Sequence, residues 1–258
     1  MKICIVSPLH GQAGCSTASI FISAALSLAL DKRTCLTHTD FSSAYIKNCF
    51  AVPVVRDVTT SLTQVTKLIK TGSIKADDML SYTVNIMPEL YLYSSFHPNT
   101  ENKLFMADYE FLIDHMTAFE HIVIDYDSSL TSEMLEKCLN LCDLIIVVVN
   151  QSNYHIEKGL ELTERIKDIL DGTEGKRILY LVNEYSSVIS TYKAAAARLK
   201  VKPRELITLS YSPYIIKCSN SNSIEDCFVS AFDNDIRVAS IKQDMVRAAR
   251  IISEIGKG

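Results

Sequence analysis

The sequence predicts an α/β protein with an open, mostly parallel central sheet and helices on both faces. Short apolar segments alternate with amphipathic helical patterns along the whole chain. Several of these segments, such as residues 144–150, are apolar at almost every position, which is typical of strands buried on both faces. The 258 residues include only eight Gly and six Pro, so long linkers are not expected. We therefore expect a single domain over residues 1–258.

In the first half of the chain, predicted strands and helices follow one another closely. A strand over residues 2–7 leads into a helix over residues 16–30, in which Ile20, Ala24 and Leu28 recur at helical spacing. The further elements expected here are a strand over residues 34–39, a helix over 61–68, a turn at Gly72, a strand over 90–94 and a helix over 102–119.

The second half of the chain shows the alternation more clearly. The predicted strands are residues 121–125, 144–150, 177–183 and 206–209. The predicted helices are residues 131–141, 154–170 (ended by Gly172), 189–199 and 236–254. Ligands of parallel α/β sheets bind beyond the carboxyl ends of the strands, so the polar residues at those ends predict one site at that edge. They are residues 7–15, Asp40, residues 125–129, Asn150 and Asn183.

The composition gives no sign of a general affinity for nucleic acids. The formal net charge is −4 and the isoelectric point is about 5.9, so the chain lacks a basic field. The eight Cys form neither a C-x-x-C motif nor a Cys/His zinc pattern. Cys138 and Cys142 share a helix face, and Cys4, Cys35 and Cys218 lie in or beside apolar segments. We expect them to be buried, reduced thiols of a cytosolic protein.

No targeting or membrane segment is expected. The strand over residues 2–7 starts the fold directly, without the charged segment and cleavage site of a signal peptide. The most apolar stretches, residues 18–30 and 144–149, are too short to span a bilayer as helices. We therefore expect a cytoplasmic protein without direct membrane insertion, which reaches a membrane or a cell pole through a partner.

Residues 7–19 have the layout of a phosphate-binding loop between a strand and a helix. Gly11 and Gly14 allow backbone N–H groups to face an anion, and the N-terminus of the following helix adds its dipole. Ser16 stands where a hydroxyl would ligate Mg²⁺, but Cys15 occupies the position of the usual lysine. Loss of one charge-assisted contact costs about 1.5–3 kcal/mol. Nucleotide binding survives that loss more easily than phosphoryl transfer does.

Blander interpretations of these residues stay open at the level of sequence. The loop could be an ordinary strand-to-helix turn without a ligand, since two glycines at this spacing are weakly specific. Asp125, Asn150 and Asn183 also suit helix caps and turns. Cys15, at a helix N-terminus, could have a depressed pKa and act as a redox thiol, although an inert small side chain is more common.

The loop resembles that of the ParA/MinD superfamily of deviant Walker ATPases, which reads Lys-Gly-Gly-x-Gly-Lys-[Ser/Thr]-Thr. In this chain His10 stands at the first lysine, Gln12 at the second glycine and Cys15 at the second lysine, while Ser16 and Thr17 form the hydroxyl pair. In relatives the first lysine reaches across a sandwich dimer to the phosphates of the partner. Both lysines are therefore replaced here.

Later motifs extend the resemblance over almost the whole chain. Residues 38–40 keep only the second acid of the family's Asp-x-Asp. Residues 122–128 keep the acid of its hydrophobic-Asp-x-Pro-Pro motif but lack the prolines. Residues 178–183 are similar to the strand whose final Asn contacts adenine in relatives, and residues 211–220 look like the segment that follows it. No single motif is intact, but their order and spacing match.

The resemblance implies a P-loop NTPase fold of the ParA/MinD architecture that binds ATP or ADP with Mg²⁺. The nucleotide-binding residues that it implies are His10, Gly11, Gln12, Ala13, Gly14, Cys15, Ser16, Thr17, Asn183 and Pro213. By the same resemblance, Ser16 and Asp125 would hold Mg²⁺, Asp125 through water, and Asp40 would position the attacking water.

The missing lysines favour a degenerate family member with reduced nucleotide affinity and weak or no ATP hydrolysis. The chain is most similar to the CpaE/TadZ group, which localises pilus or secretion machinery. This likeness implies a homodimeric positioning or assembly scaffold with protein partners in a membrane-associated machine.

The alternative is an active ParA-type ATPase in plasmid or chromosome partition. It would bind DNA through basic side chains within residues 193–204 and 237–250, which a solvated helix face explains more simply. A ligase similar to dethiobiotin synthetase is disfavoured because it needs the phosphate lysine. A MinD-like membrane anchor is disfavoured because residues 251–258 lack a basic amphipathic pattern.

Overall fold

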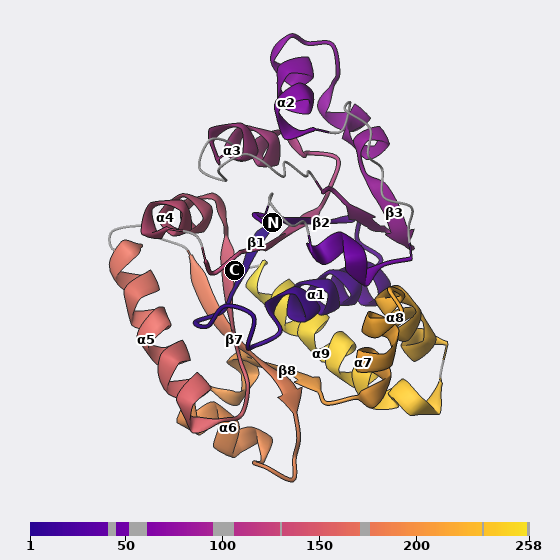
Figure 1. Cartoon of the computed structure of the whole chain (residues 1–258). Coiled ribbons are helices and arrows are strands. Elements are labelled where there is room, and N and C mark those ends of the chain that lie inside the picture. Colours follow the sequence, from indigo (N-terminus) through magenta and orange to yellow (C-terminus); the bar gives the residue numbers. More distant parts are fainter. Residues whose placement is uncertain are drawn as a thin grey trace.

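The computed structural model confirms the predicted open, mostly parallel α/β sheet (Figure 1). It describes residues 1–40, 45–51, 61–94, 106–129, 131–170, 176–233 and 235–256. The strands found there are β1 (Lys2–Val6), β2 (Thr34–His38), β3 (Val84–Met87), β4 (Leu90–Leu92), β5 (His121–Asp125), β6 (Leu144–Val149), β7 (Arg177–Tyr185) and β8 (Leu206–Ser210). In this part of the chain they form one sheet in the order β3-β4-β2-β5-β1-β6-β7-β8. Only β3 and β4 pair antiparallel, and the other neighbouring strands are parallel.

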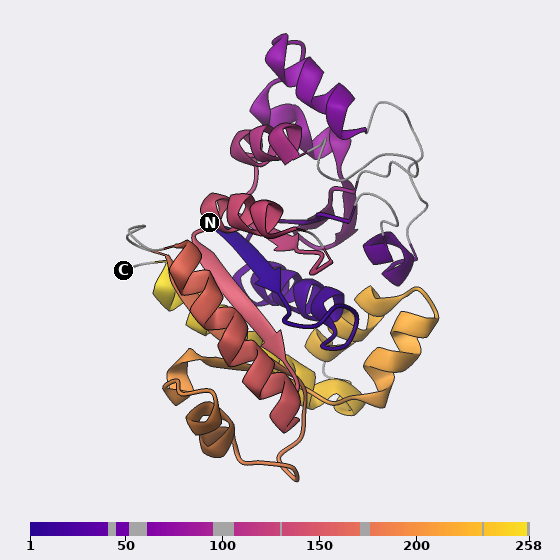
Figure 2. The ribbon, with the colours of Figure 1, turned by 60° about the vertical axis from the view of Figure 1, so that its left-hand side comes forward.

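Helices cover both faces of the sheet, as Figures 1 and 2 show. One face packs against α1 (Cys15–Leu30), α7 (Pro213–Asn220), α8 (Ile224–Phe232) and α9 (Ala239–Ile255). The opposite face packs against α2 (Leu62–Lys70), α3 (Met106–His115), α4 (Ser132–Leu141), α5 (Asn153–Ile169) and α6 (Tyr192–Arg198). Among these described helices, none combines the length and the apolar character that a bilayer crossing requires.

The pleat of β1 divides the interior into two cores. Ile3 and Ile5 belong to the core under α1, whereas Cys4 and Val6 belong to the core under α4 and α5. β6 is buried at all of its positions, as its continuous apolar sequence predicts. α1 is apolar nearly all round because α8 and α9 cover the side that faces away from the sheet, and Phe21 meets Phe228 with ring centroids 6.2 Å apart.

Among the described strands and α-helices, three are not predicted by the sequence patterns. β3 is a half-buried strand at the edge of the sheet, and its sequence contains no continuous apolar segment. The chain turns back from β3 into β4 through Glu89, whose φ is +55°. α7 and α8 lie in a segment rich in Ser and Asn, which has no long apolar pattern. α7 begins after Ser212, whose Oγ accepts a hydrogen bond from the Tyr214 N–H at 3.2 Å, and has Pro213 at its first position.

Some predicted boundaries differ from the observed ones. The predicted helix over residues 189–199 starts too early, because Thr191 caps α6 by accepting a hydrogen bond from the Ala194 N–H. The predicted closing helix over residues 236–254 is a short 3₁₀ turn, η6 (Ile236–Val238), followed by α9. Within the predicted 102–119 helix, residues 102–105 lie outside the described residues, as does the predicted helix end at Gly172.

Gly159 lies where α5 packs closely on the sheet, so its substitution tests this contact. A Cβ atom there would lie 2.5 Å from Cγ1 of Val149, which is a stiff, fully buried β-branched side chain on β6. We expect Gly159→Ala to destabilise the fold by about 1–3 kcal/mol, even though Ala favours a helix. The measurement is the free energy of unfolding in urea.

The matched control is Gly256→Ala at the end of α9. A Cβ atom at that position has no neighbour closer than 3.9 Å. We expect this control to leave the free energy of unfolding within about 0.5 kcal/mol of the wild-type value. Equal stability of the two variants would contradict the close contact between α5 and β6.

Candidate functional site

The loop between β1 and α1 depends on its two glycines for different reasons. Gly11 and Gly14 both have φ of +69°, in the left-handed region that favours glycine. A Cβ at Gly11 would meet nothing within 4 Å, whereas a Cβ at Gly14 would lie 2.3 Å from Nδ2 of Asn183. That Nδ2 donates a hydrogen bond to the Ala13 carbonyl at 3.0 Å. Gly14 is therefore required by both its backbone conformation and its contact with the end of β7.

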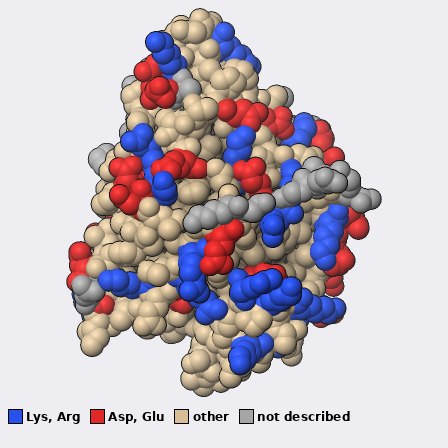
Figure 3. All heavy atoms as spheres, turned by 180° about the vertical axis from the view of Figure 1, so that it is seen from behind, with Lys and Arg blue, Asp and Glu red and all other residues tan. Residues whose placement is uncertain are grey.

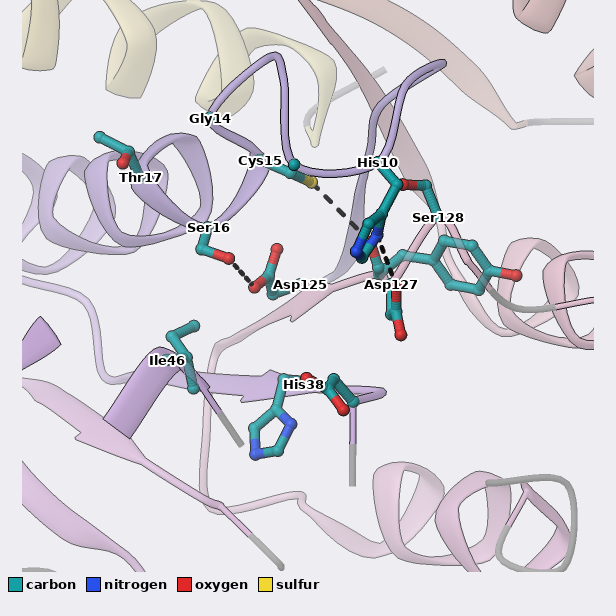
Figure 4. Close-up of a pocket in the computed structure, with 13 residues that line it drawn as sticks. His10, Gly14, Cys15, Ser16, Thr17, His38, Ile46, Asp125, Asp127 and Ser128 are labelled. Carbon is teal, nitrogen blue, oxygen red and sulfur yellow. Dashed lines mark hydrogen bonds and ion pairs between the residues drawn. The ribbon is translucent and has the colours of Figure 1, made fainter. Parts of the chain in front are cut away.

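A cavity of about 470 Å³ lies beside this loop at the carboxyl ends of β1, β2 and β5 (Figure 4). Its lining comes from the loop and the start of α1, from the end of β2, from η1 (Tyr45–Cys49) and from the end of β5. The lining residues are His10, Gly11, Gly14, Cys15, Ser16, Thr17, His38, Asp40, Ile46, Asp125, Tyr126, Asp127 and Ser128. The predicted convergence of polar residues at this edge is thus observed for the loop and for the ends of β2 and β5.

Asp125 is the most enclosed carboxylate of the cavity. Ser16 Oγ donates a hydrogen bond to its Oδ2 at 2.7 Å, and Ser19 Oγ donates to its Oδ1 at 2.9 Å. The side chain is buried, and burial raises the pKa of the Asp125 carboxyl, although the two serine hydroxyls oppose the shift. A carboxylate and a hydroxyl at hydrogen-bond distance are oxygen donors of the kind that Mg²⁺ prefers.

Cys15 lies at the start of α1 with its side chain in this cavity. Its Sγ is 3.5 Å from the Ile5 carbonyl oxygen and 3.9 Å from that of Tyr126. Burial and the nearby charge of Asp125 raise the pKa of the Cys15 thiol well above its ordinary value. Both effects oppose the depressed pKa that the interpretation of Cys15 as a redox thiol requires.

His10 and Asp127 form an ion pair above the cavity when the imidazole is protonated. The distance from His10 Nδ1 to Asp127 Oδ1 is 3.2 Å, and the His10 side chain is 70% exposed while that of Asp127 is 11% exposed (Figure 4). Asp127 is held in place because it also accepts hydrogen bonds from the backbone N–H and the hydroxyl of Ser129. His10 thus pairs within its own chain, at the position that the motif resemblance aligns with the first lysine.

From the sequence, Asp127 was expected at this site only as one of residues 125–129, without a specific role. Ile46 was not expected there, and His38 was treated only as part of the 38–40 motif. The signal for Asp127 was present, since a second acid follows the strand-end acid two positions later, where the family motif has a proline. His38 Nε2 lies 2.6 Å from Ser94 Oγ, and burial lowers the pKa of the imidazole to about 4. It is therefore neutral at physiological pH.

The remaining predicted residues lie on the other side of the loop. A second cavity of about 160 Å³ opens between the ends of β7 and β8 and helix α7. Its lining residues are Gly14, Thr17, Asn183, Glu184, Leu209, Ser210, Tyr211, Ser212, Ile215, Ile216, Ser219 and Asn220. Gly14 and Thr17 line both cavities, so the two spaces meet across the start of α1.

Not every predicted residue lines a cavity. Pro213 starts α7 beside Ser212 but is not itself part of the lining, and Gln12 and Ala13 belong to the loop but to neither cavity. Asn150 lies in neither cavity, and its Oδ1 accepts a hydrogen bond from the Ser152 N–H, as in a turn. For Asn150 the turn interpretation holds.

Solved structures of MinD and ParA proteins are similar to this chain along nearly its whole length. The MinD septum site-determining protein of Pyrococcus horikoshii, complexed with Mg-ADP, is 16% identical, with a TM-score of 0.71 over 99% of this chain and 96% of that chain. A ParA family ATPase of Chlorobium tepidum is 15% identical, with a TM-score of 0.71 over 96% and 98% of the two chains. A putative plasmid partition protein of Borrelia burgdorferi bound to AMPPNP is 19% identical, with a TM-score of 0.66 over 98% of each chain.

The chain therefore has the fold of the MinD and ParA ATPases, as its motifs predict. No protein-family model matches the sequence, and no curated protein matches it either.

Replacement of Asp125 by Asn should raise the melting temperature at neutral pH. Because burial raises the pKa of this carboxyl, its ionised form opposes folding, and the amide of Asn carries no charge. Asn can still bond both serine hydroxyls. The gain should shrink as the pH falls through the raised pKa and should vanish below the ordinary value of 3.8, because the wild-type carboxyl is then protonated in both the folded and the unfolded state. Thermal unfolding followed by circular dichroism over this pH range tests the prediction.

The control for this variant is Asp168→Asn, at an exposed position on α5. We expect it to leave the melting temperature nearly unchanged at neutral pH. A melting temperature of Asp125→Asn equal to or below that of the wild type at neutral pH would contradict the raised pKa.

Cys15 should react slowly with iodoacetamide at neutral pH, because its raised pKa leaves almost no thiolate. The rate should increase only under alkaline conditions. Mass spectrometry of the peptide that contains Cys15 gives the extent of alkylation, with free cysteine in the same tube as the reference. Alkylation of Cys15 faster than that of free cysteine would restore the redox interpretation.

Proposed function

We propose that this chain is a degenerate nucleotide-binding protein of the ParA/MinD type. It binds Mg·ATP or Mg·ADP with reduced affinity and hydrolyses ATP slowly or not at all. The observation that carries the proposal is the hydrogen bond between Ser16 and Asp125 at the N-terminus of α1, beside a loop that Gly14 holds in a left-handed conformation. This arrangement offers oxygen ligands for a metal ion next to backbone amides that can face a phosphate.

The cation position fits the residues that are present. Ser16 Oγ and the Asp125 carboxylate point toward each other in the cavity, and Asp125 would act through a water molecule. A bound Mg²⁺ would supply the positive charge that phosphate groups need at this site. The raised pKa of the Asp125 carboxyl supports this role, because a buried acid without a cation is expensive to ionise.

The second cavity supports a position for the base. Asn183 lines it and at the same time fixes the loop through the Ala13 carbonyl, so a nucleotide that reaches from one cavity to the other would pass over Gly14 and Thr17. Ser212 and Ile215, on either side of Pro213, form the opposite wall. The MinD neighbour with Mg-ADP and the partition protein with AMPPNP support a nucleotide as the ligand.

The charges around the first cavity favour weak binding of a nucleotide. The first cavity is lined by Asp40, Asp125 and Asp127, and none of its described lining residues is Lys or Arg. His10 is engaged with Asp127 and mostly exposed. A polyphosphate would therefore depend on the metal ion and on backbone amides for its attraction. Asp40 would still be able to position a water molecule, but none of the described lining residues carries a permanent positive charge to offset the charge that develops during phosphoryl transfer.

The biological role that fits these properties is a positioning or assembly scaffold. A homodimer with protein partners in a membrane-associated machine, such as a Tad-type pilus or secretion system of the CpaE/TadZ kind, agrees with nucleotide binding without rapid turnover. The MinD and ParA neighbours support a positioning role of this general kind.

Partition with DNA binding is the second candidate. Figure 3 shows acidic and basic side chains together on the rear face, with the basic ones gathered in its lower half. Several basic residues of the C-terminal region are engaged within the chain: Arg237 pairs with Asp235, and Arg247 lies 3.6 Å over the Tyr192 ring. Arg250 lies 4.0 Å from Glu254. These contacts favour a structural role for the three arginines.

Restoring the missing lysine tests the proposal. We expect Mg·ATP to raise the melting temperature of the wild type little or not at all, and that of Cys15→Lys clearly, because the new ammonium would gain about 1.5–3 kcal/mol of interaction with the phosphates. Thermal shift at several nucleotide concentrations, with and without Mg²⁺, is the measurement.

Cys15→Met is the matched control, since it adds length without charge. A shift of equal size in the Lys and Met variants would show that cavity filling, and not phosphate binding, is measured. Multiple-turnover ATP hydrolysis by the wild type, stimulated by DNA at low salt, would contradict the proposed scaffold function and would favour a partition ATPase.

A further inference from the structure

Three buried cysteines meet on the sheet face that α4 covers, away from both cavities. Cys4 lies on β1, while Cys138 and Cys142 lie one helical turn apart at the end of α4. The Sγ atoms of all three lie within 4.8 Å of one another, and those of Cys4 and Cys138 are 3.8 Å apart. The side chains are 0%, 0% and 1% exposed in the order of the sequence. We call this group the thiol triad.

The thiol triad has the dimensions of a metal–thiolate site. Three sulfurs bound at ~2.3 Å to a central ion in one plane stand about 4.0 Å apart. The observed separations, 3.8 Å for one pair and at most 4.8 Å for the others, already lie close to this value. Small rotations of the side chains would complete the triangle without a shift of β1 or α4.

The three sulfur ligands and the buried core around them indicate which metal ion the site would bind. Thiolates favour soft ions such as Cu(I) and Zn²⁺ and iron–sulfur clusters. Structural zinc sites take four protein ligands, and iron–sulfur clusters also require four. Within the part of the chain that the structure describes, no fourth Cys, His or carboxylate joins the three sulfurs. The three sulfurs lie in a buried, mainly hydrophobic core, away from bulk water. A three-coordinate soft cation, Cu(I), fits this environment.

The ammonium group of Lys176 provides positive charge near the end of α4, where a copper–thiolate site would carry excess negative charge. Lys176 Nζ donates hydrogen bonds to the carbonyl oxygens of Leu139 and Asn140, at 2.8 and 2.7 Å, in the last turn of α4. It thereby offsets the negative end of the helix that carries two of the sulfurs. It also acts electrostatically on Cys138 and Cys142. The excess negative charge of a copper–thiolate centre would thus be partly compensated.

The geometry points to a binding site for one Cu(I) ion formed by Cys4, Cys138 and Cys142. This site is separate from the proposed nucleotide site and does not depend on it. Because its sulfurs are buried, the ion enters as the chain folds or when α4 opens locally.

The test uses the whole chain, reduced and free of metal at the start. The protein is produced in copper-supplemented medium, and a second sample is incubated for a day with Cu(I) as its glutathione complex. Copper per chain is measured after desalting in the presence of a Cu(I) chelator. We expect one ion per chain to be retained, with only sulfur neighbours at ~2.3 Å in the copper X-ray absorption spectrum.

Variants separate the thiol triad from other cysteines. Cys138→Ala and Cys142→Ala should lose the retained copper. Cys35→Ala should keep it, because Cys35 is equally buried in the same core but lies outside the triad. Lys176→Gln should bind copper about tenfold more weakly, as expected for a group that supports the ligands from outside. Circular dichroism of each copper-free variant verifies that it is folded.

Three results would overturn the site. They are the absence of retained copper in both wild-type samples, equal retention by folded Cys138→Ala, and an X-ray absorption spectrum with oxygen or nitrogen neighbours. In each case the three thiols would be small apolar side chains of the core and nothing more.

Discussion

The close approach of the Gly14 backbone to the Asn183 side chain holds the candidate site together. Asn183 is nearly fully buried at the end of β7, and its amide must find a hydrogen-bond partner, which it does at the Ala13 carbonyl. The contact leaves no room for a Cβ at Gly14. It joins the loop after β1 to β7, which lies two positions away from β1 in the sheet, and it places the start of α1 between the two cavities.

Asp125 and Cys15 show how the same enclosed environment acts on two neighbouring groups. Burial raises the pKa of both, so the carboxylate is harder to ionise and the thiol stays neutral. The carboxylate is nevertheless supported by two serine hydroxyls from α1. A cavity that keeps its acids but has a neutral thiol at the lysine position is suited to a ligand that brings its own cation. This is the physical basis for proposing a metal–nucleotide complex at reduced affinity.

Local patterns were sufficient to predict the architecture and much of the loop. Continuous apolar segments predicted β1, β5, β6 and β7, because strands buried on both faces tolerate few polar residues. The helix over residues 16–30 was recognised from its periodic apolar positions. Local patterns did not predict β3, α7 or α8, because a half-buried edge strand and two short helices contain no long apolar pattern. The pairing of Asp127 with His10 was not predicted, because it depends on how the two loops lie beside each other in the fold.

The sequence by itself determined the α/β class, the position of the glycine loop and the absence of lysine at Cys15, because each depends on residue types at short spacing. Only the tertiary structure decided which distant residues meet. Asn183 reaches Ala13 across 170 positions, and Cys4 reaches Cys138 across 134. The pKa of Cys15 was decided in the same way, since it depends on burial and on a carboxylate that another strand supplies. Strand order and side-chain packing set these distances, and no local pattern encodes them.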